Sequence, residues 1–333
     1  MNAPSSLLTA ALHSDRRGVL LGLILLLVLF LVGAILVDGF DSANNLRSIL
    51  VLAAFLGIAS LGQTLVALVG ALDLSIPFVI GVANILLAFL FATGLPPVIC
   101  IVVIAALGAG IGATNGLISY RVQGQSLIVT LGVGFIVAGA AQILTTASSI
   151  YSGSVFTEIP HWLAEVASVN GSTFGLPVPP VVILWGVLCA IVIVVLRRTR
   201  PGREIYAVGG NRTAARRLSI SEFRVWMLTH TASGLTAAMA GMLLLGFSGG
   251  GFVGVGDPYL FTTVAAVVVG GTSLLGGSGG YGATVVGALV LQTLTSLLVG
   301  LGFNFAAQQT IFGLLILPMV ALYARAPNIR LQI

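Results

Sequence analysis

The sequence predicts an all-α polytopic membrane protein with about ten transmembrane helices and both termini cytoplasmic. Its 333 residues are 58% hydrophobic and only 7% charged, and the mean hydropathy is +1.14. About a quarter of the residues in soluble domains are charged, so the bilayer is the main solvent of this chain. At roughly 20 residues for each span, plus short loops, the length fits one membrane domain.

The first helix is expected at residues 18–37, after a polar tail formed by residues 1–17. The pair Arg16 and Arg17 resembles the start of an export signal. However, the apolar run is longer than the roughly 7 to 15 residues of a signal core, and no A-x-A cleavage site follows it. We therefore expect an uncleaved helix, a cytoplasmic tail and a membrane domain over residues 18–333.

Further spans are expected where apolar runs are bounded by Pro, Gly or polar clusters. These runs are 48–71, 77–92, 97–120, 126–146, 181–196, 225–247, 259–270, 281–301 and 306–323. The helices near Gly108, Gly112 and Gly116, and those near 134–138, carry small residues at four-residue spacing. Small residues let helices approach closely in a membrane, so both sets predict tight packing.

Basic residues set the orientation, because loops rich in Lys and Arg stay in the cytoplasm. Eight of the 14 basic residues, all of them Arg, lie in the polar stretch 197–224. This stretch is expected at the cytoplasmic face, and the connections 147–180 and 248–257 at the outer face. Residues 160–168 of the first connection are expected to form a short interfacial helix, and 248–257 a flexible loop. Topology accounts for the arginines without nucleic acid.

No catalytic or metal-ligating constellation stands out in the sequence. The three histidines lie far apart, and Cys100 and Cys189 fall in separate apolar runs, as buried free thiols do. A phosphate-binding loop of the Walker type needs a Lys, and the chain has none. We therefore expect a protein that is no enzyme, binds no metal or cofactor, and relies on another chain for any ATP hydrolysis.

Asp73 lies between two apolar runs, where a carboxylate inside the bilayer costs several kcal/mol and is by default a functional candidate. The alternative is that Asp73 and Ser75 cap the helix that begins at Pro77. The Gly-rich segment 270–280 also interrupts an apolar pattern, and such backbone survives at membrane depth only when buried or lining a wet cavity. A pathway for a polar solute is therefore predicted near Asp73, Ser75, Asn115, Thr130, Thr272 and Ser273.

Within the polar stretch, residues 211–220 are expected to form a short helix that its first residue, an Asn, caps. Ala214 and Leu218 share one face of that helix, and Arg212 and Arg216 share another. An apolar ridge beside guanidinium groups suits a hydrophobic groove with an acidic rim on a cytoplasmic partner. The alternative is a plain basic loop that only sets topology. Two Gly-containing pairs, at 201–202 and 209–210, are expected to form turns.

Four blocks of residues resemble the membrane permease subunits of ribose-type sugar ABC importers. The first is GREIYAVGGN at 202–211 with AAR at 214–216 and Ile220. The others are DLS at 73–75, NGL at 115–117 with TLG at 130–132, and AAVVVGGTSL at 265–274 with GG at 276–277. The similarity covers about 44–323, nearly the whole chain.

The resemblance implies an inner-membrane, multi-pass permease that carries a monosaccharide of pentose or hexose type. A periplasmic sugar-binding protein would deliver the sugar, and two cytoplasmic ATPase subunits would drive a pair of permeases, identical or paralogous. It assigns ATPase coupling to Arg203, Tyr206, Gly209, Gly210, Asn211, Arg212, Ala214, Ala215, Arg216, Leu218 and Ile220. The chain departs from the family where a Gly near the end of this loop is Ser219, and where Y-E-L is replaced by YLF at 259–261.

The outer connections carry Glu158, Glu165 and Asp257, whose acidic character can steer a binding protein that carries Lys or Arg. A competing hypothesis is a secondary transporter or channel that works alone on a small polar solute. Ion coupling needs ionisable residues near the midplane, and apart from Asp73 the sequence offers almost none there.

Overall fold

A computed structural model describes residues 5–122, 125–146 and 154–324, and this part of the chain is mainly helical. The helices are α1 (Ser5–Leu36), α2 (Ala43–Leu68), α3 (Ile76–Ala92), α4 (Pro97–Arg121), α5 (Ser126–Thr146), α6 (His161–Ala167), α7 (Pro180–Arg198), α8 (Arg200–Gly210), α9 (Arg212–Arg217), α10 (Glu222–Ser248), α11 (Tyr259–Val269), α12 (Tyr281–Gly300) and α13 (Phe305–Ala324). Two short strands, β1 (Ser154–Val155) and β2 (Gly251–Phe252), and a 3-10 helix, η1 (Val253–Gly256), complete it.

Seven helices in the described residues are long and apolar enough to cross a membrane: α1, α2, α4, α5, α7, α10 and α12. The segments Ile76–Ala92 and Val253–Val269 are shorter apolar helices. The protein is therefore an all-α polytopic membrane protein. Its first helix begins at Ser5, so the helix continues through most of the residues that the sequence analysis set apart as a polar tail.

Helix boundaries follow the local side chains. The Ser42 Oγ accepts a hydrogen bond from the backbone N–H of Asn45 and caps α2. The Ser221 Oγ does the same for the N–H of Arg224 at the start of α10. At the other end of α10, Gly249 takes φ 74°, the left-handed conformation that only glycine adopts without strain.

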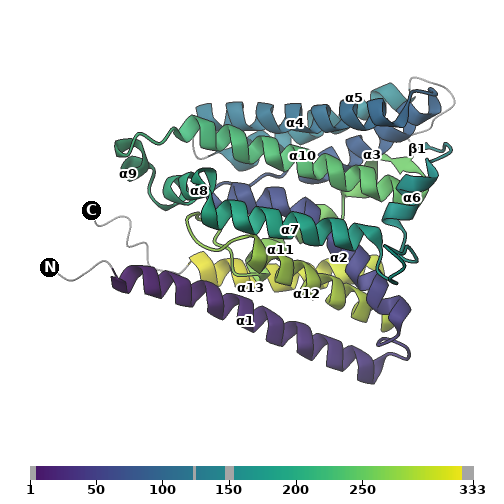
Figure 1. The fold of residues 1–333 in the computed structure, drawn as a ribbon, viewed down its shortest axis with the longest axis horizontal. Coiled ribbons are helices and arrows are strands. Elements are labelled where there is room, and N and C mark those ends of the chain that lie inside the picture. Colours follow the sequence, from purple (N-terminus) through teal and green to yellow (C-terminus); the bar gives the residue numbers. More distant parts are fainter. Residues whose placement is uncertain (1–4, 123–124, 147–153, 325–333) are drawn as a thin grey trace.

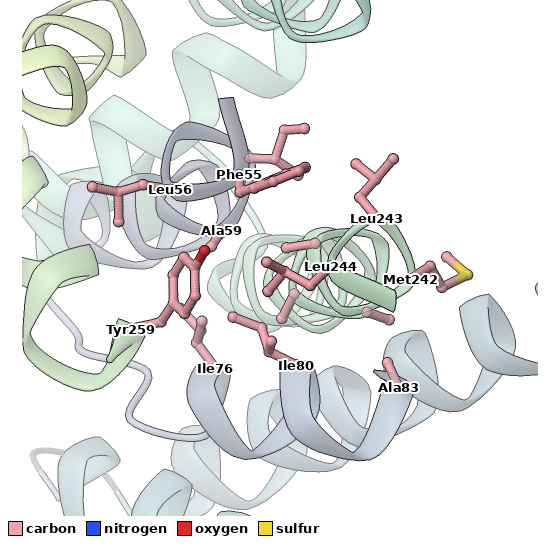
Figure 2. Close-up of a cluster of buried hydrophobic side chains, with 14 of the residues drawn as sticks. Phe55, Leu56, Ala59, Ile76, Ile80, Ala83, Met242, Leu243, Leu244 and Tyr259 are labelled. Atoms are coloured by element: carbon pink, nitrogen blue, oxygen red, sulfur yellow. The ribbon is translucent and has the colours of Figure 1, made fainter. Parts of the chain in front are cut away.

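The helices form a buried centre and a lipid-facing periphery. In the most apolar window of each helix, 83% of the residues of α2 are buried, against 11% for α1. Helix α10 packs against α2, α3 and α4. Figure 2 shows this centre: Phe55 of α2, Ile80 of α3 and Leu244 of α10 meet in one apolar cluster. A peripheral helix exposes apolar side chains because lipid is its solvent.

Helices α4 and α10 cross at glycines. A Cβ on Gly112 would clash with the carbonyl oxygen of His230, and one on Gly234 would clash with the carbonyl oxygen of Gly108. The small residues of α4 thus bring the two backbones into contact, as their four-residue spacing predicts. This close crossing fixes the position of α10, which carries several polar side chains into the centre.

Between α10 and α12 the chain runs as two pieces, residues 251–256 and α11 (Tyr259–Val269). Gly251 packs against the C-terminal half of α3, and a Cβ on Gly256 would clash with the carbonyl oxygen of Pro77 near its start. Residues 251–256 therefore run along α3, and α11 continues from them. The expectation of a loop at 248–257 is wrong, because β2 and η1 form there and the glycines at 251 and 256 let the backbone lie directly against α3. The strand β2 also pairs with β1 in antiparallel fashion.

The two ends of the molecule carry different elements (Figure 1). The basic helices α8 and α9 lie at one end, and α6 with β1 lies at the opposite end. Helix α6 falls within the range expected for an interfacial helix, residues 160–168. Helix α8 was not expected at all: the pairs at 201–202 and 209–210, interpreted as turns, both lie inside it.

Candidate functional site

Asp73 lies at the centre of a buried hydrogen-bonded network. It is 1% exposed, and its Oδ1 accepts hydrogen bonds from the Ser75 backbone N–H at 3.0 Å and from the Ser75 hydroxyl at 2.6 Å. Its Oδ2 accepts from the Ser233 hydroxyl of α10 at 2.7 Å. The Asn115 amide of α4 donates to the Ser75 oxygen at 2.7 Å. The carboxylate is thus held by hydroxyl and backbone donors, in a network that joins three parts of the chain.

Thr130 ties α5 to the same segment. Its hydroxyl accepts a hydrogen bond from the backbone N–H of Leu74 at 2.9 Å. Four of the six residues predicted for a pathway, Asp73, Ser75, Asn115 and Thr130, therefore lie together. The bond from the Ser75 N–H to the Asp73 Oδ1 forms a turn just before α3. The capping alternative does not fit this geometry, because the Ser75 side chain at the N-cap accepts no hydrogen bond from the first turn of α3 and its hydroxyl donates to Asp73 instead.

Several polar atoms around this network lack partners among the described residues. They are the Asn115 Oδ1, the Ser119 Oγ and the His230 Nε2. The other ring nitrogen of His230 lies 3.0 Å from the Trp226 carbonyl oxygen. A buried polar atom without a partner costs about 1–3 kcal/mol, so this region is not optimised for stability alone. Sequence reasoning missed Ser233 and His230, although both lie in a polar run, THTAS at 229–233, within an otherwise apolar helix.

Thr272 and Ser273 lie elsewhere, in the turn between α11 and α12. The Thr272 hydroxyl accepts from the Gly280 N–H at 3.1 Å, and the Ser273 Oγ accepts from the Leu275 N–H at 3.2 Å. These bonds close the turn 270–280 on itself. Its backbone reaches α2, because the Gly277 N–H donates to the Leu68 carbonyl oxygen at 2.9 Å.

Helix α8 packs into the angle between α2 and this turn. A Cβ on Gly209 would clash with the Leu68 carbonyl oxygen and would lie 2.8 Å from the Gly277 nitrogen. The Tyr206 hydroxyl donates to the Gly279 carbonyl oxygen at 2.7 Å. Gly209 is therefore needed for close approach to the backbone of α2 and not for a turn. For this reason the residues predicted to form a turn, 209–210, belong to a helix. Ile205 is buried on the same face.

Helix α9 forms within the range expected for a coupling helix. The Asn211 Oδ1 accepts from the Ala214 N–H at 2.9 Å and caps it, as predicted. Ala214 and Leu218 are exposed, Leu218 at 73%, while Ala215 is buried. Ser219, where the family carries Gly, takes φ 59°, a left-handed conformation that glycine tolerates best. The predicted apolar ridge therefore faces away from the protein.

Two of the three arginines of α9 are bound within the chain. The Arg216 guanidinium donates to the Glu222 Oε2 from Nη2 at 2.8 Å and from Nε at 3.0 Å. The Arg212 Nη1 lies 3.5 Å from the Glu222 Oε1, and its guanidinium lies over the Trp226 ring, 5.0 Å from the centroid. The interpretation that both arginines wait for a partner's carboxylates is therefore incomplete: Glu222 at the start of α10 holds them already.

A second acid joins α8 to α10. The Glu204 carboxylate lies 2.9 Å from the Arg200 Nε and 3.6 Å from the Arg224 Nη2. The remaining members of the predicted coupling set fall on this unit as well: Arg203 is exposed, and Gly210 and Ile220 are half-buried. Glu204 and Glu222 thus link three helices, α8, α9 and α10, into one assembly at this end of the molecule.

The acids predicted for binding-protein docking lie at the other end. Glu158, Glu165 and Asp257 are all exposed. Glu165 has one near neighbour, the His161 Nδ1 at 3.7 Å. In residues 5–122, 125–146 and 154–324, no group of three or more His, Cys, Asp or Glu residues could hold a metal ion.

Comparison with known proteins places this geometry in a family. Residues 45–320 match the family described as branched-chain amino acid transport system / permease component. A probable ABC transporter permease protein of Escherichia coli K12 is 34% identical, over 92% of this chain and 89% of its own. The ribose import permease of the same organism is 32% identical over 91% of both chains, and the fructose import permease of Rhizobium meliloti is 31% identical over 93% and 86%. No solved structure matches.

These relatives confirm the resemblance that GREIYAVGGN at 202–211 and the three other blocks indicated. The matched region runs from the start of α2 into α13, so it includes the Asp73 network and all of α8 and α9. The chain belongs to the membrane permease family of ABC importers.

Proposed function

We propose that this protein is the permease subunit that carries a monosaccharide across the inner membrane, with a separate ATPase and a periplasmic binding protein. One observation carries the proposal: relatives named as ribose and fructose import permeases align over more than nine-tenths of this chain. A relative named as a D-allose transport permease is 28% identical over 92% of it. The hydroxyl-rich network around Asp73 suits a solute that carries hydroxyl groups.

The test is ATP-dependent uptake by the assembled importer in proteoliposomes. Tritiated D-ribose, D-fructose and D-allose are supplied in turn with the cognate binding protein, and L-leucine serves as the alternative that the family description suggests. Import of at least one sugar, and none of leucine, is expected. Import of leucine without any sugar would show that the proposed substrate class is wrong. Uptake that persists without the ATPase would favour a stand-alone transporter.

The topology has ten crossings with both termini cytoplasmic. Seven long helices, the short apolar helix α3, the broken crossing through η1 and α11, and α13 supply the ten. The arginines of α8 and α9 then lie inside, as the positive-inside rule requires. Single cysteines at Thr213 and Asn170, in a chain without its own two cysteines, should react with an impermeant maleimide from opposite sides. Reaction of both from one side would contradict this topology.

Coupling follows two routes from the cytoplasmic end. The ATPase binds the exposed Ala214 of α9 and Leu218, which directly follows this helix. Glu222 transmits the displacement of α9 to α10, whose Ser233 holds Asp73 at 2.7 Å. Gly209 of α8 presses on the backbone of α2 and the turn 270–280. A partner shifts a conformational equilibrium only through contacts that differ between the states, and these are contacts that movement of α9 or α8 would change.

The Asp73 network is the inner part of the pathway. Its hydrogen-bonding groups come from α4, α5, α10 and the segment before α3, so separation of these helices exposes hydroxyl and amide groups that a sugar can use. Asp73→Asn removes the charge and keeps the shape, and should reduce uptake while the ATPase stays bound. Unchanged uptake by this variant would mean that Asp73 only holds the turn before α3 in place.

A further inference from the structure

A cavity of about 380 Å³ lies at the end of the molecule opposite α8 and α9. Its walls come from the last turns of α10, from η1, and from α12 and α13, and the first turn of α11 forms its floor. Ligand pockets span roughly 300–1,000 Å³, so the volume suits a small solute. Tyr259, in the first turn of α11, is held by packing: it is buried, and Figure 2 shows it beside Ile76 with its hydroxyl directed toward Ala59.

The lining has no charged side chain and combines two kinds of group. Aromatic rings come from Phe247, Phe252 and Phe305, all of them partly exposed. Side-chain amides come from α12 and α13, at Gln292 and Gln309. Within the described part of the chain, neither of these two amides has a hydrogen-bond partner, so each can both donate and accept.

Two hydroxyls and a third amide add acceptors. The Thr262 and Thr295 hydroxyls each donate to a carbonyl of their own helix, at 2.7 and 2.8 Å, and keep lone pairs free to accept. The Gln308 Nε2 donates to the Phe303 carbonyl oxygen at 3.0 Å, which leaves its Oε1 free of that bond. Uncommitted polar groups from three helices thus converge on one aromatic-walled space.

We infer that this cavity is a saccharide-binding site on the outer part of the pathway, where an uncharged monosaccharide rests after release from the binding protein; the inference rests on the proposed function. A sugar ring presents C–H faces that pack on aromatic rings. Its hydroxyls both donate and accept, which matches amides that do the same. In this site, Gln292 and Gln309 are the residues that hold the sugar.

Other occupants fit the same walls less well. A lipid chain would leave the amides of Gln292 and Gln309 buried without partners, at the cost of desolvation. An amino acid would bring a carboxylate and an ammonium group into a lining with no opposite charge, and burial of unpaired charge is far more costly. The neutral lining therefore selects for hydroxyl-bearing, uncharged solutes.

The test uses the assembled importer in proteoliposomes, with D-ribose, D-fructose and D-allose as probes. Gln292→Leu and Gln309→Leu remove the amides at similar volume. Gln142→Leu, on the exposed side of α5, is the matched control. We expect each cavity variant to lower the sugar imported per ATP hydrolysed by about tenfold, the effect of one hydrogen bond in the transfer step, while the control stays within twofold. Co-purification with the ATPase, which binds the far end, is expected for all three.

A second readout does not depend on transport. Gln309→Cys, in a chain without other cysteines, is labelled with an impermeant maleimide in 100 mM of each sugar and, for comparison, in buffer without sugar. We expect at least one sugar to slow labelling severalfold, and to leave labelling of Gln142→Cys unchanged.

The outcomes separate the two proposals. Normal sugar import by both Leu variants, as a lipid-filled groove would allow, or equal labelling of Gln309→Cys with and without every sugar, overturns this site and leaves the proposed function standing. Import of L-leucine and no sugar by the unaltered protein overturns the proposed function, and this site with it.

Discussion

The two ends of the molecule hold their acidic side chains differently. At the α8–α9 end, Glu204 and Glu222 each lie against two arginines and are largely buried. At the α6 end, Glu158, Glu165 and Asp257 are exposed, and none has an arginine partner among the described residues. Acids paired inside the chain join helices into one body, whereas exposed acids remain available to a partner in solution. This difference fits the proposed roles, in which the first end transmits movement of the ATPase and the second attracts the binding protein.

The largest expected effect comes from the exposed face of α9. Ala214→Asp places a carboxylate on the ridge proposed to enter the ATPase, and leaves every arginine and Glu222 in place. Membrane insertion should survive because the positive charges remain. ATPase co-purification and uptake should both fall below a tenth, since an unpaired buried charge opposes docking. A variant that still binds the ATPase and transports would show that α9 is not the docking element.

The ion pairs of Glu222 give the next effect. Glu222→Gln keeps the shape of the side chain but weakens its hold on Arg212 and Arg216, so movement of α9 should reach α10 less completely. We expect the ATPase to bind normally while the sugar imported per ATP falls about tenfold, the effect of roughly 1–2 kcal/mol in charged hydrogen bonds. Glu204→Gln is the comparison, because it cuts the α8 link instead. Tight coupling in both variants would mean that these acids only stabilise the fold.

Adjacent glycines of α8 allow a matched test of the second route. Gly209→Ala forces a Cβ into the carbonyl oxygen of Leu68, whereas Gly210→Ala meets nothing within 4 Å. Alanine favours a helix over glycine by up to about 1 kcal/mol, so Gly210→Ala should raise thermal stability slightly and keep transport. Gly209→Ala should lower both, transport severalfold. Equal behaviour of the two variants would remove the contact between α8 and α2 from the coupling route.

The sequence predicted features that depend on composition and on spacing within one segment. The basic stretch, the Asn211 cap and the glycine crossing of α4 all rest on residues close together in the chain. The grouping of Asp73 with Asn115 and Thr130 followed from the polar character of each residue in an apolar background. Its partner Ser233 was missed, because the local sequence does not show that the polar run 229–233 of α10 faces Asp73.

Glycine was the main source of error. At 201–202, 209–210 and 248–257 it was interpreted as a sign of turns or flexibility, whereas Gly209, Gly251 and Gly256 bring their backbone into contact with that of another helix. Local sequence cannot distinguish these uses, since the neighbouring backbone comes from a remote helix. The outer cavity was also out of reach, because Gln292 and Gln309 are lone amides on two helices whose relative rotation only packing determines.

The smallest effect is expected at the α6 end. Neutralising Glu158, Glu165 and Asp257 together, as two Gln and one Asn, removes charge that steers a basic binding protein but leaves α8 and α9 untouched. The association rate at low salt should fall by roughly three- to tenfold, and its dependence on salt should weaken, because exposed charges act mainly on encounter. Sugar imported per ATP should not change, since coupling resides at the other end.

Stopped-flow binding at 20 and 200 mM salt measures the first effect, the association rate, and proteoliposome uptake measures the second, the sugar imported per ATP. An unchanged rate at low salt would remove the docking role of these acids, and a loss of coupling would contradict the separation of the two ends.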